Sequence, residues 1–329
     1  MTAALLAIAT ALLTAALTWA YFLGMRARKH LEPPSARGMH GTPVVTGVGA
    51  VIVAVTIGMS ATWSVRDLAG GHALLLAAAA CLAAISWVDD CKGGVPPVVR
   101  LLGHALAVAL LLATMGEEQR LLPAVPIVVE RVLLAVALVW FINLFNFMDG
   151  IDGLAGTGTI AIAAGYILVA GVPATEDTMA YLALVIAAAA AGYLVWNWHP
   201  AKVMMGDTGA ITLGFLLGWL MIDLALRGHA AAAVILPLYF LADATLILSR
   251  RILRGEKPWQ PHREHAYQRA ALAMGSHAPV VIRISAGNAL LVVLAILSKQ
   301  YPLAALTGAI AVVAVLISHL EQLARRSVA

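Results

Sequence analysis

Long apolar stretches follow one another along almost the whole chain, separated by short polar or turn-forming segments. A helix needs about 20 consecutive, mostly apolar residues to cross a bilayer. Stretches such as 74–85 and 180–191 are apolar on every face, whereas the strands of a membrane β-barrel alternate between apolar and polar residues. The pattern therefore predicts an all-α, polytopic integral membrane protein with about eleven transmembrane helices, at 3–24, 44–63, 73–88, 101–115, 126–146, 153–171, 179–197, 210–226, 230–248, 281–298 and 303–320.

The composition agrees with a membrane environment. Of the 329 residues, 62% are hydrophobic and only 12% are charged, which is about half the charged fraction usual in soluble domains. One water-soluble core cannot hide this much apolar surface. Eleven helices with short loops use nearly all of the length, so we expect a single membrane-embedded domain over residues 1–329, with a basic loop at 249–280 inside it.

The positive charges lie mainly on one side of the predicted helices. Of the 21 Lys and Arg residues, 16 fall in or beside the loops that share a side with the segment 25–43. Cytoplasmic loops carry such an excess, so we expect the N-terminus outside and the C-terminus in the cytoplasm. The net charge of +4 is then explained by contact with anionic lipid headgroups, and no nucleic-acid partner is expected.

Acidic residues gather at helix ends on the predicted cytoplasmic side. Carboxylates are rare at membrane depth and often mark function. Several carboxylates at one face need a nearby positive charge, or their pKa values rise. Mg²⁺ takes oxygen ligands, one or two carboxylates together with substrate phosphates being usual, and the Asn146 amide could add another ligand. The acidic residues concerned are Asp89, Asp90, Asp149, Asp152 and Asp207.

The basic loop offers the complementary charge. Its segment QPHREHAYQRA contains His262, Arg263 and His265, and such side chains bind phosphate oxygens, arginine through two parallel hydrogen bonds. Acidic residues for a metal and basic residues for phosphate indicate phosphoryl-type transfer on a phosphorylated substrate.

Each feature also has a simpler explanation when it stands alone. An Asp-Gly pair often forms only a turn, and a histidine in a loop is often only solvated. A cation-coupled transporter is the main alternative, but it would place its aspartates near the midplane of broken helices. A CDP-alcohol phosphotransferase would need a DG-x-x-AR spacing, which is missing after Asp149–Gly150.

Three segments together resemble the polyprenyl-phosphate N-acetylhexosamine-1-phosphate transferases, over nearly the whole chain. They are WVDDCKGG, NFMDGIDGLAG and PAKVMMGDTGAITLGF. The resemblance implies transfer of HexNAc-1-phosphate from a UDP-N-acetylhexosamine to undecaprenyl phosphate, with release of UMP. It also implies Mg²⁺, with Mn²⁺ as a substitute, and a bacterial inner membrane with the active site facing the cytoplasm. The resemblance further implies that the product starts a lipid-linked cell-surface glycan such as O-antigen, and it is compatible with a homodimer.

The resemblance assigns roles to particular positions. Asn146 and Asp207 correspond to the magnesium ligands, and Arg263 and His265 to the residues on the nucleotide phosphates. Lys202 and Asp243, the latter before a basic pair, complete the expected substrate-binding set. The catalytic acids implied are Asp89, Asp90, Asp149 and Asp152.

The chain also departs from the family pattern. A histidine-rich motif is replaced by His265-Ala266-Tyr267-Gln268, which resembles the subgroup that handles 6-deoxy sugars such as N-acetylfucosamine or N-acetylquinovosamine. The segment EPPSARGMHGTP matches the family's first basic loop only loosely, at Pro34, Arg37, His40 and Pro43. The identity of the sugar is left open.

Overall fold

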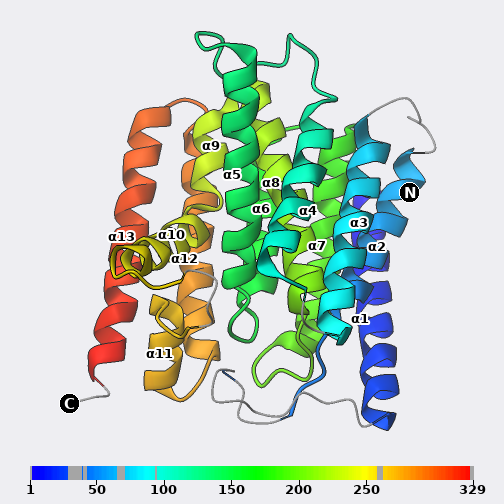
Figure 1. Cartoon of the computed structure of the whole chain (residues 1–329), viewed down its shortest axis with the longest axis vertical. Coiled ribbons are helices and arrows are strands. Elements are labelled where there is room, and N and C mark those ends of the chain that lie inside the picture. Colours follow the sequence, from blue (N-terminus) through cyan, green and yellow to red (C-terminus); the bar gives the residue numbers. More distant parts are fainter. Residues whose placement is uncertain are drawn as a thin grey trace.

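The protein is a bundle of helices that run mostly side by side (Figure 1). The computed structural model describes residues 2–28, 39, 43–64, 71–92, 95–257 and 262–326. In these ranges the all-α prediction is confirmed, with one isolated parallel bridge between Val45 and Val203. Of the predicted first basic loop, Pro34, Arg37 and His40 lie outside the described residues.

The helices are named in chain order. They are α1 (Ala3–Ala27), α2 (Gly49–Ser64), α3 (Gly71–Lys92), α4 (Pro97–Leu112), α5 (Ile127–Phe147), α6 (Leu154–Ala170), α7 (Thr178–Asn197), α8 (Gly206–Leu224), the π-helical turn η1 (Ala225–His229), α9 (Ala230–Ile235), α10 (Leu238–Leu253), α11 (Ala266–Met274), α12 (Ala278–Leu297) and α13 (Pro302–Arg326).

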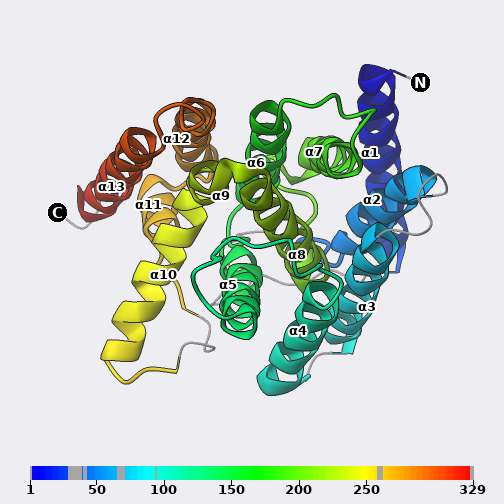
Figure 2. The same ribbon diagram turned by 90° about the horizontal axis from the view of Figure 1, so that it is seen from above.

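Among the described residues, seven segments are long and apolar enough to cross a membrane, and α8, η1 and α9 together form one of them. Three shorter apolar helices, α2, α4 and α6, run alongside them (Figure 1). Each predicted span except 230–248 coincides with a single one of these segments. The first helix, α1, and the last helix, α13, lie at opposite sides of the bundle (Figures 1 and 2). The number of crossings and their direction in a membrane remain predictions.

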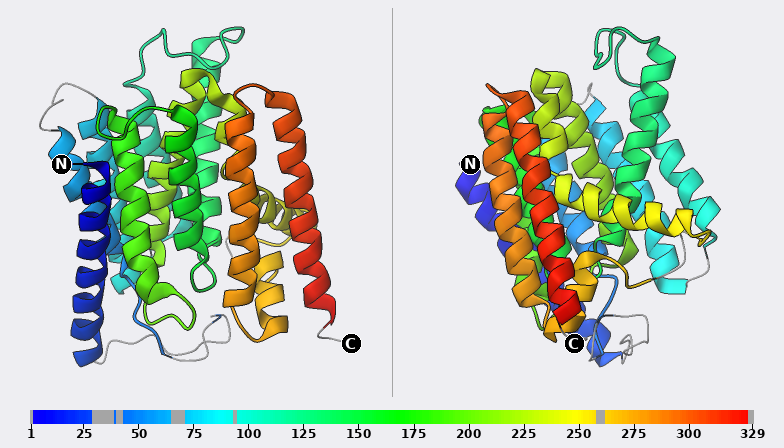
Figure 3. Two further views of the ribbon diagram at one scale, coloured as in Figure 1. Left: turned by 180° about the vertical axis from the view of Figure 1, so that it is seen from behind. Right: turned by 90° about the vertical axis from the view of Figure 1, so that its left-hand side faces the viewer.

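The predicted ninth span, 230–248, is wrong as a single helix. Its first part is α9, which continues α8, and its second part belongs to α10. Seen from above, α10 extends across the bundle while most of its neighbours are seen end-on (Figure 2), and the side view in Figure 3 agrees. Pro237 lies at the break. Proline has no backbone N–H and clashes with the preceding turn, so it ends α9 there.

Helix α8 is the centre of the bundle. It packs against α2, α3, α5, α6 and α7. In the most apolar 18-residue stretch of the α8–α9 segment, 78% of the residues are buried, whereas the corresponding fraction is 22% in α1 and in α13. Large apolar side chains remain exposed on the outer helices, for example Leu106, Val136 and Val315. An apolar perimeter of this extent suits contact with lipid rather than water.

The start of α2 packs directly on the start of α8, so a substitution at this contact can test the fold. A Cβ on Gly49 would lie 2.2 Å from the Gly209 backbone nitrogen and 2.4 Å from the Met205 carbonyl oxygen. Since backbone atoms cannot move aside easily, Gly49→Ala is expected to lower the free energy of unfolding by about 1–3 kcal/mol. Thermal unfolding of the purified protein in detergent measures this loss.

The matched control is Gly58→Ala in the same helix, because a Cβ there meets nothing within 4 Å. We expect this variant to unfold at or slightly above the wild-type temperature. Equal unfolding temperatures for Gly49→Ala and wild type would contradict the close approach of α2 and α8.

Candidate functional site

The predicted acidic residues meet at one end of the bundle, the lower end in Figure 1. Asp89 and Asp90 end α3, Asp207 lies in the first turn of α8, and Asp149 lies in the turn that follows α5. Asn146, near the end of α5, hydrogen-bonds to the Asp207 side chain. The structure therefore brings both predicted magnesium ligands into contact. Their role as ligands stays a prediction.

Asp90 holds the beginning of α8. Its carboxylate accepts hydrogen bonds from the backbone N–H groups of Asp207 (3.1 Å) and Thr208 (3.0 Å) and from the Thr208 hydroxyl (2.7 Å). The first N–H groups of a helix lack partners within it, and negative charge is stabilising at that end. Asp90, from α3, is therefore the N-terminal cap of α8.

Gly206 makes this capping contact possible. Its φ is +69°, a left-handed conformation that glycine adopts without strain. A Cβ at this position would also lie 2.8 Å from Asp90 Oδ2. The glycine of the GD pair is therefore needed both for the turn and for the approach of Asp90.

A short extended segment fixes the chain that leads into α8. The Met204 N–H donates to the Val45 carbonyl (2.8 Å), and the Gly49 N–H donates to the Met205 carbonyl (2.8 Å). The segment 202–205 thus lies beside 45–49 before α2 and α8 begin. Apolar burial adds to this, since Val45, Val203 and Met205 are fully buried.

Arg100 is the cation of the acidic cluster, and sequence reasoning did not single it out. Its Nη1 lies 3.0 Å from Asp89 Oδ2 and 2.5 Å from Asp207 Oδ2. Asp89 also accepts a hydrogen bond from the Val95 N–H (2.9 Å). The signal was a single arginine in the first turn of an apolar helix, on the same side as the aspartates, where an ionised residue needs a partner.

Asp207 and Arg100 are accessible, with 30% and 28% of their side chains exposed, whereas Asp89 is more enclosed at 13%. A ligand can therefore reach Asp207 and the guanidinium together. Within the described residues, Arg100 is one positive charge beside three carboxylates. The surplus negative charge and the oxygen donors suit a hard divalent cation, so the residues present fit the Mg²⁺ that the sequence predicts.

Asp149 experiences this crowding most directly. Burial raises the pKa of the Asp149 carboxyl well above its usual range, and the charges of Asp207, Asp90 and Asp152 raise it further. Two or more carboxylates that share a site cannot all ionise easily. The fold by itself therefore disfavours the charged form of Asp149.

The other DGxDG aspartate, Asp152, engages different partners. Its Oδ2 lies 2.6 Å from His199 Nδ1 and accepts a hydrogen bond from the Ala201 N–H at 3.0 Å. Its Oδ1 lies 3.1 Å from His277 Nδ1. Sequence reasoning assigned no chemistry to the two histidines, which lie 47 and 125 residues from Asp152 in the sequence.

Asp243 and His265 are buried against each other. The Nδ1 atom of His265 lies 3.2 Å from Asp243 Oδ2, and their side chains are 2% and 1% exposed. Asp243 Oδ1 also accepts a hydrogen bond from the Ala266 N–H (3.1 Å) at the start of α11. A substrate phosphate cannot reach either side chain in this arrangement. The pair joins α10 to α11, and Arg263, just before it, is only partly buried.

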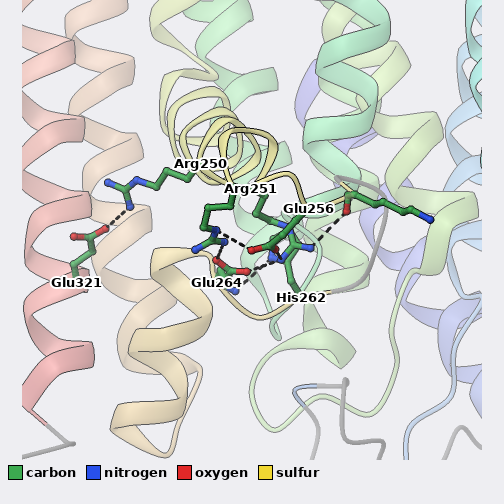
Figure 4. Close-up of polar contacts among 8 residues, drawn as sticks. Arg250, Arg251, Glu256, His262, Glu264 and Glu321 are labelled. Atoms are coloured by element: carbon green, nitrogen blue, oxygen red, sulfur yellow. Dashed lines mark hydrogen bonds and ion pairs between the residues drawn. The ribbon is translucent and has the colours of Figure 1, made fainter.

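Ion pairs hold α10 to the segments around it (Figure 4). Arg251 lies 2.5 Å from Glu264 and 2.8 Å from Glu256, and Arg250 lies 3.2 Å from Glu321 of α13. In the same cluster the pKa of His262 is lowered to about 4, mainly by burial and also by the nearby His265 and Arg251. His262 is thus neutral at pH 7 and offers no charge to a phosphate.

Lys202 lies beside two aromatic rings. Its ammonium is 4.9 Å from the ring centre of Trp196 and 5.4 Å from that of Trp19, within the range of cation–π attraction. The two indole rings stack at 4.3 Å. The lysine thus contacts α1 and α7, and no contact places it on the carboxylate cluster among the residues described.

The cap on α8 yields a testable loss of stability. Asp90→Ala removes the acceptor for two N–H groups and one hydroxyl, so we expect the free energy of unfolding to fall by about 1–2 kcal/mol. Asp90→Asn keeps an acceptor oxygen and is expected to lose less. Chemical unfolding in detergent measures both variants. An Asp90→Ala protein as stable as wild type would contradict the capping role.

Because the pKa of Asp149 is raised, replacing its carboxyl group is predicted to stabilise the fold by an amount that depends on pH. A carboxyl with a raised pKa in the folded state destabilises the fold at pH values above its unfolded pKa of about 4, increasingly until the folded pKa is passed. In buffer without divalent cations, Asp149→Asn should therefore raise the unfolding temperature at pH 7.5 and raise it less at pH 5.

The control for this pH series is Glu117→Gln, which replaces an exposed acid at the opposite end of the bundle and should shift the unfolding temperature at neither pH. A lower unfolding temperature for Asp149→Asn than for wild type at pH 7.5 would show that the crowding argument is wrong.

Comparison with known proteins covers the segments that form this site. Residues 72–225 match the family model described as Glycosyl transferase family 4, which includes the DD pair, the DGxDG turn and the GD pair. A probable undecaprenyl-phosphate N-acetylglucosaminyl 1-phosphate transferase of Bacillus subtilis is 29% identical over 191 residues, which are 54% of this chain and 53% of that protein. The chain thus aligns with about half the length of that relative.

Two further relatives align over more of their length. A decaprenyl-phosphate N-acetylglucosaminephosphotransferase of Mycolicibacterium smegmatis is 28% identical over 78% of this chain and 69% of its own. A phospho-N-acetylmuramoyl-pentapeptide-transferase of Nocardia farcinica is 29% identical over 68% and 74%. The family predicted from the three motifs is therefore confirmed, and the chain belongs to the polyprenyl-phosphate sugar-1-phosphate transferases of glycosyl transferase family 4.

Proposed function

We propose that this protein transfers a HexNAc-1-phosphate from a UDP-N-acetylhexosamine to undecaprenyl phosphate and releases UMP. The observation that carries the proposal is the cluster at the ends of α3 and α8, where Arg100 bridges Asp89 and Asp207 beside Asn146. Accessible carboxylates beside a guanidinium suit a substrate that brings both phosphate and a metal ion. The relatives' names support the lipid-phosphate acceptor.

Mg²⁺, with Mn²⁺ as a substitute, is the proposed cofactor. Asp207 and the amide oxygen of Asn146 would hold it, and their mutual contact supports this choice. A bound divalent cation neutralises charge on a pyrophosphate and orients the leaving group. The Asp207 carboxylate accepts the hydrogen bond from Asn146, so the amide nitrogen of Asn146 is the donor. The amide oxygen would therefore be the atom that faces the ion.

Arg100 is the proposed positioning residue for phosphate. A guanidinium has five N–H donors, and only one of its nitrogens is engaged by Asp89 and Asp207. The remaining N–H groups can bind phosphate oxygens while the ion pairs hold the side chain in place. Arg100 would thus stabilise charge on the transferred group without a change of partners.

The aspartates of α3 have separate proposed roles. Asp89 faces Arg100 and would position the lipid phosphate beside the donor. A phosphate monoester has a second pKa near 6, so it is already mostly dianionic at pH 7 and gains little from a general base. Asp90 caps α8, so it would act by fixing Asp207 rather than by contacting the substrate.

The residues of α10 and α11 have a proposed role on the nucleotide side. Arg263 would meet the nucleotide phosphates, and the buried Asp243–His265 pair would fix the start of α11 next to it. Asp149 would share the charge of the bound cation. Lys202 would contact substrate only after leaving its place over Trp196.

The proposal also fixes the setting of the enzyme. The site end of the bundle would face the cytoplasm, where UDP-sugars are made, across a bacterial inner membrane. The product would start a lipid-linked surface glycan such as O-antigen, and a homodimer is the proposed assembly. For the sugar, the sequence His265-Ala266-Tyr267-Gln268 favours a 6-deoxy N-acetylhexosamine.

One assay tests the activity and names the sugar. Purified protein is mixed with undecaprenyl phosphate, Mg²⁺ and, in parallel, UDP-linked GlcNAc, GalNAc, N-acetylfucosamine and N-acetylquinovosamine, and UMP release is measured. We expect Mg²⁺-dependent release with one 6-deoxy donor. Asp207→Asn and Arg100→Ala should each lower the rate by at least about 100-fold, and Arg100→Lys, which cannot form the same fork, less severely.

Arg131→Lys, the same substitution near the start of α5 at the far end of the bundle, is the matched control and should keep the wild-type rate. UMP release from none of the donors, with wild type and Asp207→Asn alike, would overturn the proposed function.

A further inference from the structure

A second group of metal-ligand side chains lies at the same end of the bundle. Asp152 belongs to the turn before α6, His199 follows α7, and His277 precedes α12. One ligand atom from each, an oxygen of Asp152 and a nitrogen of each histidine, lies within 4.8 Å of the other two. Three separate loops thus bring a carboxylate and two imidazoles to one point.

The two histidines lie on different oxygens of the carboxylate. His199 Nδ1 lies 2.6 Å from Asp152 Oδ2, and His277 Nδ1 lies 3.1 Å from Asp152 Oδ1. The two imidazole ring centres are 4.9 Å apart. Each oxygen therefore faces the Nδ1 atom of a different histidine, and both rings turn the same ring nitrogen toward the carboxylate.

Hydrogen bonding indicates the form of His277. The Asp152 N–H donates to His277 Nδ1 at 3.2 Å, a contact that requires a lone pair on this nitrogen and therefore the tautomer with its proton on Nε2. A neutral imidazole with a lone pair on Nδ1 is the form that binds a metal. The Asp152 oxygen 3.1 Å away is also an acceptor. A cation or a proton beside these two atoms would relieve their repulsion.

The cluster is enclosed on one side and open on the other. Asp152 and His277 are 3% and 8% exposed, whereas His199 is 28% exposed. A cavity of about 230 Å³ adjoins all three and is also lined by Ala201, Gly275 and other residues of the neighbouring loops. This volume admits a metal ion with several waters, and it provides a path for entry.

We propose that Asp152, His199 and His277 form a second metal site, which binds Zn²⁺ or a similar imidazole-preferring divalent ion. Two imidazole nitrogens and one carboxylate oxygen are typical of zinc sites with one position left for water. The all-oxygen donors around Asp207 suit Mg²⁺ instead. The two sites therefore differ in metal preference, and the second extends beyond the proposed transfer reaction.

Such an ion would join three loops, two of which are continuous in sequence with residues of the first site. Asp152 lies three residues after Asp149, and His199 lies eight residues before Asp207 in the segment that leads into α8. The ion would replace the hydrogen bond from the Asp152 N–H to His277 with a bond from Nδ1 to the metal. It would thereby fix the DGxDG turn relative to α7 and α12.

Cobalt titration tests the site without any substrate. The full-length chain, purified in detergent through a tag without histidines and treated with chelator, is titrated with Co²⁺, whose visible absorption is strong in four-coordinate nitrogen–oxygen sites. We expect one Co²⁺ per chain and its displacement by Zn²⁺ but not by Mg²⁺. His199→Gln and His277→Gln should each weaken binding by at least about 10-fold.

His319→Gln is the matched control, since His319 is an exposed histidine of α13, and it should bind as wild type does. His199 is partly exposed, so its variant should fold, and its unfolding temperature without metal checks this. No visible band with wild type, or unchanged affinity in a folded His199→Gln protein, would overturn the proposal. UMP release is measured separately, so either proposal can fail alone.

Discussion

The contact between the Asp90 carboxylate and the first backbone N–H groups of α8 is the interaction on which the site depends. Helix α8 is the buried centre of the bundle, and its first turn carries Asp207. Without a partner from another helix, the N–H groups at that end would be left unsatisfied. Because Asp90 comes from α3, one carboxylate both completes α8 and fixes the distance between the two acidic motifs.

That arrangement concentrates negative charge, and the neighbouring residues compensate only part of it. Arg100 contributes one guanidinium to Asp89 and Asp207, which still leaves Asp149 with a raised pKa. Electrostatic repulsion among carboxylates is costly in the fold but favours the arrival of a cation. The same charges that destabilise the fold are therefore the ones that the proposed metal–phosphate substrate would stabilise.

Histidine has two different surroundings in this structure. His265 is buried beside Asp243, where it connects α10 to α11. His199 and His277 share the carboxylate of Asp152 and adjoin a cavity. In both groups a histidine nitrogen faces an aspartate, so the distinction between a structural pair and a ligand set depends on access and on the number of ligand atoms that converge.

The sequence by itself determined the all-α class, most helix positions, the family and the set of acidic residues, because apolar length and short motifs are local properties. Tertiary structure decided the rest. The apolar character of a segment does not specify the direction in which its helix runs. The predicted span 230–248 is therefore divided at Pro237, and its second part belongs to α10, which runs across the bundle. Arg100 contacts Asp207 and His277 contacts Asp152 across 107 and 125 residues of sequence, and such contacts depend on how the helices pack.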